Sequence, residues 1–325
     1  MRWKNMGLRL EHKRGLGLLL VTPLLILYVT GCSGSRNSQR EAKEIRYIKY
    51  MERQKALAAE EQASKENPVM NAEEFERRGD FYLKQGNLHM AFLQYDKALR
   101  LDRDRPDTRY KMGRLLLEKG MTEDAHREFL EVLKVNPNHA PALDGIAWVL
   151  FKRGDLEGAE KTLQQAIALD ESLWQAHHLL GLLYDRQQNY GGAILQYKKA
   201  IVLNPNLAML FNNLGISLLL KGEYEEALQS FMEALKLESS NTKVHNNFAL
   251  TLCKLGRYEE ALEVFKRGGD EAAAYNNLGY VFMIEGKHKE AIEAFEKALQ
   301  LSPGFYTKAY ENLKKAKAAS LPSSP

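Results

Sequence analysis

Cysteine, proline and aromatic residues are all scarce in this chain of 325 residues. The only two cysteines, Cys32 and Cys253, exclude a disulfide framework and a paired CxxC metal motif. Nine prolines and an aromatic share of 9% favour helices over a β-sandwich. The hydrophobic share of 45% is enough for one or two buried cores, which excludes disorder of the whole chain.

A surplus of charge is also missing once the first residues are set aside. The net charge of +4 belongs to residues 1–31, which hold five basic residues and one acidic residue. The rest of the chain has 41 basic and 41 acidic residues. Nucleic-acid-binding proteins normally carry a basic surplus that displaces counterions from phosphates. We therefore expect no nucleic acid among the partners.

Residues 1–31 have the pattern of a secretory signal, with a basic start and an apolar run from Gly15 to Tyr28. That run is shorter than the roughly 20 residues that a membrane-spanning helix needs. The segment Val29-Thr30-Gly31-Cys32 follows and resembles the lipobox of bacterial lipoproteins. The resemblance implies that residues 1–31 are a signal peptide. It also implies that Cys32 carries acyl chains, palmitate among them, that anchor the protein to a membrane.

This resemblance implies a place in the bacterial cell envelope. Ser33, rather than aspartate, follows the cysteine, which implies sorting to the periplasmic face of the outer membrane if the host is diderm. An uncleaved signal anchor with a chance cysteine is the alternative. Residues 32–71 are interpreted as the lipidated cysteine and a charged, partly helical tether, because no clean heptad pattern persists there.

A period of 34 residues organises the rest of the chain. Small residues occupy one slot of each period: Gly79, Gly113, Ala147, Gly181, Gly215, Ala249 and, after a step shortened to 30, Gly279. Alanine recurs twelve residues later, and a large residue sixteen residues later: Tyr95, Phe129, Leu163, Tyr197, Phe231, Phe265 and Phe295. Such spacing predicts helical hairpins, in which small residues let two helices approach closely. We expect the large side chain to fill the gap to the next hairpin.

A second glycine, seven residues after the slot, marks the turn inside each hairpin except the fourth. The fourth has Gln188-Asn189, and asparagine tolerates a left-handed backbone nearly as well as glycine. Pro137, Pro205 and Pro303 follow the second helices of three hairpins, where a helix must stop.

Together these slots resemble the tetratricopeptide repeat (TPR) family over residues 72–304. The resemblance implies an all-α, right-handed superhelical solenoid of about seven helix-turn-helix repeats, with a concave groove lined by the first helices. Asn71 and Glu74 form the capping-box pattern that starts the first repeat. Residues 305–319 predict a capping helix that covers the last repeat, and residues 320–325 a disordered tail.

No catalytic constellation is found in the sequence. There is no P-loop, no Rossmann fingerprint and no HExxH motif. His177 and His178 are adjacent, so on a helix they point about 100° apart and cannot chelate one ion. Cys253 lies between leucines and is interpreted as a small hydrophobic residue. We expect no enzyme activity, no catalytic residue, no metal and no cofactor.

The groove offers candidate binding residues instead. When each repeat is counted from seven residues before its small-residue slot, positions 2, 5, 6, 9 and 12 of the first helix face inward. In the last three repeats, positions 5 and 6 are asparagine: Asn212-Asn213, Asn246-Asn247 and Asn276-Asn277. Asn213, Asn247 and Asn277 predict a ladder of amides that pairs with the backbone of an extended peptide. The alternative is that these asparagines only bond to neighbouring helices.

Two apolar groups accompany the ladder. Met209, Leu250 and Tyr280 are placed to receive apolar side chains of a partner. Trp148 and Phe151 predict an aromatic step in the middle of the groove. All five are alternatively part of the core between repeats.

The lipobox, the asparagine pairs and the shortened sixth repeat together resemble TadD-type lipoproteins of tight-adherence (Flp) pilus assembly, and in plan the PilF-type pilotins of type IV pili. The resemblance implies a non-enzymatic, lipid-anchored assembly factor whose groove binds an envelope protein, such as a secretin or pilus assembly component. The alternative is an adaptor lipoprotein that regulates an envelope peptidoglycan hydrolase or protease. We also expect the shortened sixth repeat to bend the groove between two rungs of the ladder.

Overall fold

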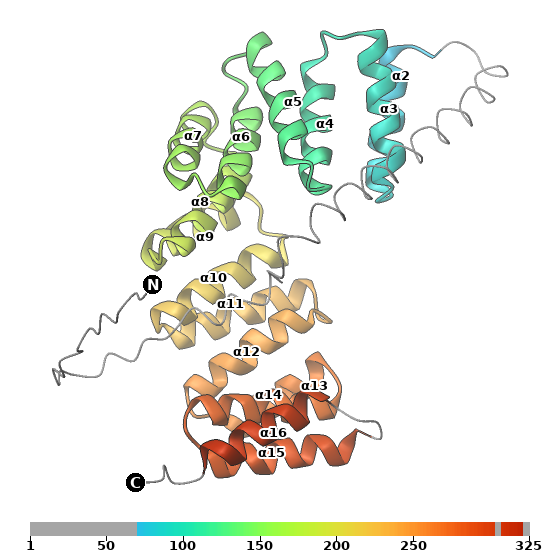
Figure 1. Ribbon diagram of the computed structural model, residues 1–325. Helices are drawn as coiled ribbons and strands as arrows, with labels where there is room; N and C mark the ends of the chain where they lie inside the picture. Colours follow the sequence, from blue (N-terminus) through green and yellow to red (C-terminus); the bar gives the residue numbers. More distant parts are fainter. Residues whose placement is uncertain (1–69, 303–306, 321–325) are drawn as a thin grey trace, which may run out of the picture. The chain divides into compact units, whose positions relative to one another are not determined.

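The computed structural model describes residues 70–302 and 307–320, and every regular element in these residues is an α-helix. The helices form hairpins that follow one another in chain order (Figure 1). The seven hairpins are α2 (Ala72–Lys84) with α3 (Leu88–Leu101), α4 (Pro106–Glu118) with α5 (Thr122–Val135), α6 (Ala140–Arg153) with α7 (Leu156–Leu169), α8 (Trp174–Arg186) with α9 (Tyr190–Leu203), α10 (Ala208–Lys221) with α11 (Tyr224–Leu237), α12 (Thr242–Lys254) with α13 (Tyr258–Gly268), and α14 (Glu271–Ile284) with α15 (His288–Leu301). A last helix, α16 (Thr307–Ala319), follows them.

The turn inside each hairpin depends on one residue with a left-handed backbone. Six turns use the predicted glycine, with φ between 72° and 92°: Gly86, Gly120, Gly154, Gly222, Gly256 and Gly286. In the fourth hairpin Gln188, not Asn189, takes this conformation, with φ of 60°. Asn189 instead caps α9, because its short side chain accepts a hydrogen bond from the backbone N–H of Gly192 at 3.0 Å.

The small-residue slots bring the two helices of a hairpin together. A Cβ atom added at Gly215 would lie 2.6 Å from a ring carbon of Phe231, the large residue of the same repeat. The ring therefore fills the space inside its own hairpin rather than only the gap to the next one. Phe129 does both, because it also lies against Gly145 of the following repeat. All these rings are fully buried.

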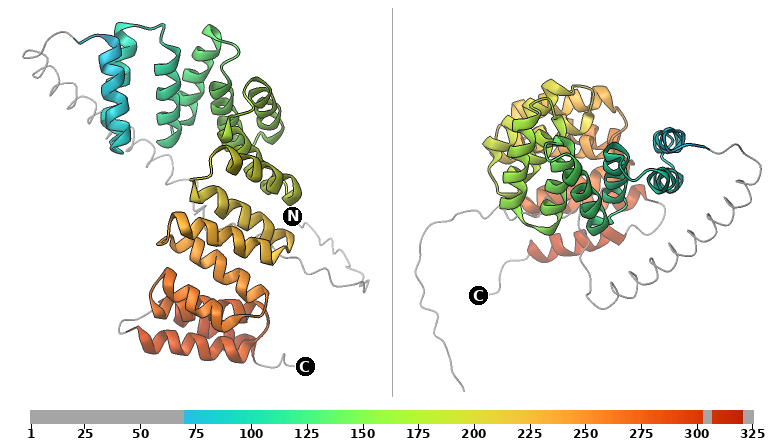
Figure 2. Two further views of the ribbon diagram at one scale, coloured as in Figure 1. Left: turned by 180° about the vertical axis from the view of Figure 1, so that it is seen from behind. Right: turned by 90° about the horizontal axis from the view of Figure 1, so that it is seen from above.

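Successive hairpins pack mainly with the second helix of one against the first helix of the next, and their first helices also contact each other. Contacts join α4 with α6, α6 with α8, α10 with α12, and α14 with α16, and no comparable contacts join consecutive second helices in the described residues. A stack that is tighter along its first helices curves with these helices on the inside. Figure 2 shows the same row from two further directions, with each hairpin turned relative to the one before. The predicted all-α TPR solenoid is confirmed.

Both ends of the described solenoid have specific closures. Asn71 and Glu74 form the predicted capping box, with both hydrogen bonds present. At the other end, Ala309 and Ala316 of α16 are buried, and Leu313 packs beside Phe295 of α15. The helix begins at Thr307, and Phe305 lies outside the described residues.

The shortened sixth repeat loses length at the end of its second helix. As the glycine pair predicts, α13 ends at Gly268, with Gly269 as its C-cap. Gly268 lies so close to α12 that an added Cβ would be 2.6 Å from the Cβ of His245. Lys266 then bridges to Glu271 at the start of α14, with 3.2 Å between Nζ and Oε1.

No helix in the described residues is long and apolar enough to cross a membrane. The predicted signal peptide, Cys32 and most of the tether lie outside these residues, as do Pro303 and residues 321–325.

Candidate functional site

The first helices carry a repeated polar contact between neighbouring repeats. In each case position 5 of one repeat meets position 6 of the next, and we call each such contact a rung. Nδ2 of Asn247 donates to Oδ1 of Asn212 at 3.0 Å, and Nδ2 of Asn277 faces Oδ1 of Asn246 at 3.5 Å. The second of these spans the shortened repeat. The loss of four residues therefore falls in α13 and leaves the rung in place.

The series of rungs extends beyond the predicted asparagines in both directions. Towards the C-terminus, Asn312 of α16 donates to Oδ1 of Asn276 at 3.1 Å. Towards the N-terminus, Nδ2 of Asn213 lies 3.1 Å from Nε2 of His178. His178 is buried, and burial lowers its pKa to about 4, so its ring is neutral and accepts this hydrogen bond.

An ion pair takes the same place in the first two repeats. Nζ of Lys111, at position 6 of the second repeat, lies 2.7 Å from the carboxylate of Glu76, at position 5 of the first. Arg105 and Thr108 donate to the same carboxylate at 2.6 and 2.7 Å. Burial alone would raise the pKa of Glu76, but these hydrogen bonds outweigh it and lower the pKa to about 2.

The rungs are missing on both sides of the third repeat. Position 5 holds Tyr110 and Asp144 at these two junctions, and the facing position 6 holds Gly145 and Leu179, which have no polar side chain. Asp144 is fully buried, and neither carboxylate oxygen has a hydrogen-bond partner in the described structure. Arg114 lies 3.6 Å away. Burial raises the pKa of Asp144 to about 7, although the positive charge of Arg114 acts to lower it.

The rungs leave one side of the asparagine ladder unused. Nδ2 of Asn247 and of Asn277 is committed to the preceding repeat. Their Oδ1 atoms accept no hydrogen bond from any described residue, and neither oxygen is sealed from solvent. Because a side-chain amide has separate donor and acceptor ends, a fixed Nδ2 sets the direction of the free oxygen. In Asn213 both ends are engaged, because its Oδ1 accepts from Nδ2 of Asn212 at 3.4 Å and its Nδ2 faces His178. Within the ladder, Asn247 and Asn277 therefore present a free acceptor and Asn213 does not.

The predicted apolar residues lie on the same three first helices, with Met209 on α10, Leu250 on α12 and Tyr280 on α14. Met209 and Tyr280 are 43% and 37% exposed, which is unusual for large apolar groups on a helix that packs against its neighbours. Leu250 is half-buried and packs against the core around Phe265. The first two are therefore accessible to a partner, and Leu250 is shared between core and surface.

Trp148 and Phe151 do lie together. Their ring centroids are 6.0 Å apart with an interplanar angle of 86°, an edge-to-face pair. Both are half-buried against the core of the third and fourth repeats. Nζ of Lys152 lies 6.0 Å from the Trp148 ring centroid, and the Arg186 guanidinium 5.5 Å from that of Phe151. The aromatic step is thus bordered by two cations.

The remaining candidates for chemistry have structural roles. Nδ1 of His177 lies 2.8 Å from Oε1 of Gln196, so the two adjacent histidines face different partners. Cys253 is 2% exposed, and burial raises the pKa of its thiol to about 12, as expected for a packed hydrophobic residue. No cluster of three His, Cys, Asp or Glu side chains in the described residues is placed to hold a metal ion.

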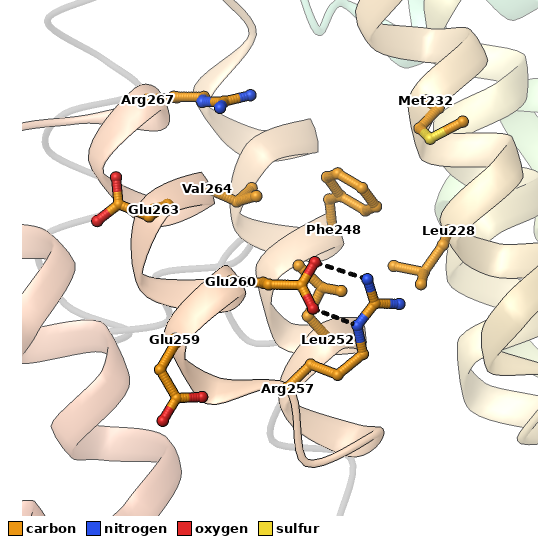
Figure 3. A pocket seen from close by; sticks show the side chains of 10 residues that line it. All are labelled: Leu228, Met232, Phe248, Leu252, Arg257, Glu259, Glu260, Glu263, Val264 and Arg267. Carbon is orange, nitrogen blue, oxygen red and sulfur yellow. Dashed lines mark hydrogen bonds and ion pairs between the residues drawn. The ribbon is translucent and has the colours of Figure 1, made fainter.

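A separate hollow is lined by α11, α12 and α13 of the fifth and sixth repeats (Figure 3). Its volume is about 480 Å³, and Phe248, Leu252 and Val264 line it together with Met232. Charged side chains border it, with Arg257 and Glu260 paired at 2.6 Å. It lies between α11 and α13, whereas the candidate binding residues are on the first helices.

Sequence reasoning missed Asp144, His178 and Asn312 as parts of the polar series. A signal was present, because all three occupy position 5 or 6 of their helices. The stagger that joins position 5 to position 6 of the next repeat could not be read from the period alone, since it depends on how far adjacent helices slide past each other.

The fold and the groove define a helical-repeat protein that presents a concave surface for protein partners. Tetratricopeptide repeat models match residues 75–105, 110–173, 145–208, 208–241, 246–268 and 272–305. These matches cover most of the chain, which therefore belongs to the tetratricopeptide repeat family, a family of protein–protein interaction scaffolds.

Curated relatives match over short segments. A TPR repeat-containing thioredoxin of Arabidopsis thaliana, TTL4, is 29% identical over 95 residues, which are 29% of this chain and 14% of that protein. The CTR9 homolog of Arabidopsis thaliana is 36% identical over 84 residues, or 26% of this chain and 8% of that protein. The chain thus spans a small part of either relative.

Solved structures match over longer stretches. A structure of pilF from Pseudomonas aeruginosa has a TM-score of 0.51 and 21% identity, and the match covers 66% of this chain and 96% of that one. The Cut9–Hcn1 assembly of the APC/C gives 0.56 and 20%, covering 73% and 48%. At these identities the likeness shows the fold alone.

Proposed function

We propose that the groove of the fifth to seventh repeats binds an extended segment of another envelope protein. The observation that carries this proposal is the pair of solvent-reachable, unpaired Oδ1 atoms on Asn247 and Asn277, together with the exposed Met209 and Tyr280 on the first helices of the same repeats. The oxygens accept N–H groups of a partner backbone, and the apolar side chains cover its apolar residues. The rungs hold the amides in place before the partner arrives, which lowers the entropy cost of binding.

We further propose a non-enzymatic assembly factor for a pilus or secretion system, with a secretin or pilus component as the partner. The lipobox at Cys32 and the resemblance to TadD-type lipoproteins support this role. An acyl anchor at Cys32 would hold the groove close to membrane partners and raise their local concentration. Replacement of Cys32 by serine should abolish incorporation of a labelled palmitate and release the protein from the membrane fraction. Unchanged labelling would contradict the anchor.

The groove is tested by blocking it without disturbing the rungs. The double variant Met209→Glu, Tyr280→Glu places two charges on exposed groove positions. The matched control is Met232→Glu, because Met232 lies in the same repeat as Met209, is 46% exposed and faces the other side, on α11. We expect affinity capture from native membranes to recover the same secretin or pilus proteins with wild type and control, and to lose them with the double variant. Equal recovery by all three would overturn the proposal.

The identity of the captured proteins decides the system. Recovery of peptidoglycan hydrolases or proteases, lost in the double variant, would keep the groove but replace the pilus role by the adaptor role.

A further inference from the structure

The two junctions without rungs coincide with the aromatic step. Position 6 is Gly145 in the third repeat and Leu179 in the fourth, so this part of the groove has no amide to bond a partner backbone. Trp148 and Phe151 project from the first helix between these junctions. A partner segment that continues from the amide ladder into this region therefore meets aromatic side chains. It no longer meets amide oxygens that can accept its backbone N–H groups.

The two cations that border the step have no acidic partner within the described residues. Arg186 donates to the backbone oxygen of Phe151 at 3.3 Å and lies over its ring, and Lys152 lies over Trp148. Neither side chain makes an ion pair in the described structure. Both are exposed to solvent. They keep their full charge available to a partner.

The neighbouring carboxylates are already occupied or out of reach. Asp185, adjacent to Arg186, accepts hydrogen bonds from the hydroxyls of Tyr197 and Ser217, both at 2.7 Å. Asp144 is fully buried beneath the surface. Glu160, on α7, accepts the hydroxyl of Tyr184 at 2.9 Å. Asp144 is buried and Asp185 and Glu160 are half-buried, whereas Lys152 and Arg186 are exposed. Of these groups, the two most accessible to a partner are therefore the positive ones.

We propose that the third and fourth repeats recognise an apolar or aromatic side chain flanked by an acidic residue in the partner segment. The apolar group packs on Trp148 and Phe151, and the carboxylate pairs with Lys152 and Arg186. This ion pair is strengthened because the rings exclude water from one side of the cations. The inference rests on the proposed function and adds to it. The central repeats select the partner by its side chains, and the last three hold its backbone.

The test probes an array of short peptides with the full chain. Each peptide carries one central phenylalanine or leucine, flanked by aspartate and glutamate, by lysine and arginine, or by serine. We expect the acidic set to bind about tenfold more tightly than the serine set, with a preference that weakens at high salt. The charge reversal Lys152→Glu, Arg186→Glu should invert the preference towards the basic set.

A matched control separates the local effect from net charge. Lys134→Glu, Lys236→Glu makes the same change in charge on α5 and α11, at exposed positions that face away from the groove. This control should keep the acidic preference. If the double variant loses helicity by circular dichroism, the single variant Lys152→Glu replaces it in the test. Lys152 lies over the Trp148 ring and makes no hydrogen bond in the described structure, so this variant should fold.

The outcomes distinguish the two proposals. Binding without a charge preference, or equal loss in the control, would overturn this inference and leave the groove function standing, provided that Met209→Glu, Tyr280→Glu still abolishes binding. Absence of binding to every peptide class would overturn the proposed function and this inference with it.

Discussion

The first two repeats and the last four are joined at the same pair of positions by different chemistry. Glu76 and Lys111 form an ion pair within a cluster of charges, whereas Asn247 donates a single amide hydrogen bond to Asn212. Between these regions Asp144 faces the apolar Leu179 of the next repeat and accepts no hydrogen bond, with Arg114 3.6 Å away. One backbone geometry thus supports a charged contact, a neutral contact and no contact. Stacking therefore depends on the apolar core, and the rungs adjust local stability and the surface offered to partners.

The largest effect is expected in the charged junction. Glu76→Ala leaves Arg105 and Lys111 without their shared carboxylate, and we expect the local opening free energy of α2 and α3 to fall by about 2 kcal/mol. Hydrogen exchange measures this loss helix by helix. The control is Glu73→Ala on the same helix, where an exposed pair with Arg77 contributes little. A loss that is the same at high salt, or the same in the control, would contradict the role of the charge cluster.

A second effect is expected at the junction of the third and fourth repeats, which has no rung, and its size depends on pH. The pKa of Asp144 is about 7 in the folded state and near 3.9 when unfolded. The folded state therefore holds a proton that the unfolded state releases, and stability falls as pH rises from about 4 to about 7. Asp144→Asn removes this charge, so it should stabilise α6 by about 2 kcal/mol at about pH 8 and by almost nothing near pH 4.

Hydrogen exchange of α6 and α8 across this pH range checks the prediction, with the exposed Asp107→Asn as its control. A gain that does not vary with pH would show that the carboxylate is not titrating in this window.

The smallest effect is expected in the amide series. Asn312→Ala removes a neutral hydrogen bond to the buried Asn276, and we expect α16 to lose about 1 kcal/mol of local stability. Lys314→Ala on the exposed side of the same helix is the control. High salt should leave this loss unchanged, in contrast to the Glu76 variant. A salt-dependent loss would mean that the cap is held by its ion pair between Lys317 and Glu296 rather than by the amide.

The fold was predictable because the TPR period depends on local rules. The capping box at Asn71, the glycine turns and the early end of α13 at Gly268 each follow from residues within one hairpin. The site was predictable only in part. The asparagines and the aromatic pair were identified from the sequence. That they bind a partner remains a prediction.

The partners of these side chains were beyond sequence reasoning. Which amide atom is free depends on contacts between residues 31 to 36 apart, set by the slide of one helix along another. The missing hydrogen-bond partner of Asp144 likewise follows from the apolar Leu179, one repeat away.

The amide rungs also bear on how the repeat array can change in length. Because the fifth, sixth and seventh repeats all carry asparagine at both positions, a duplicated or deleted copy in this region would find the same donor and acceptor on either side. A copy inserted between α11 and α12 would lengthen the backbone-holding surface by one unit. Duplication of the third repeat would instead place Asp144 opposite a Gly145, and duplication of the fourth would place His178 opposite a Leu179, neither of which has a polar side chain. The C-terminal repeats are therefore the part of the molecule in which duplication alone would lengthen the surface that holds a partner backbone.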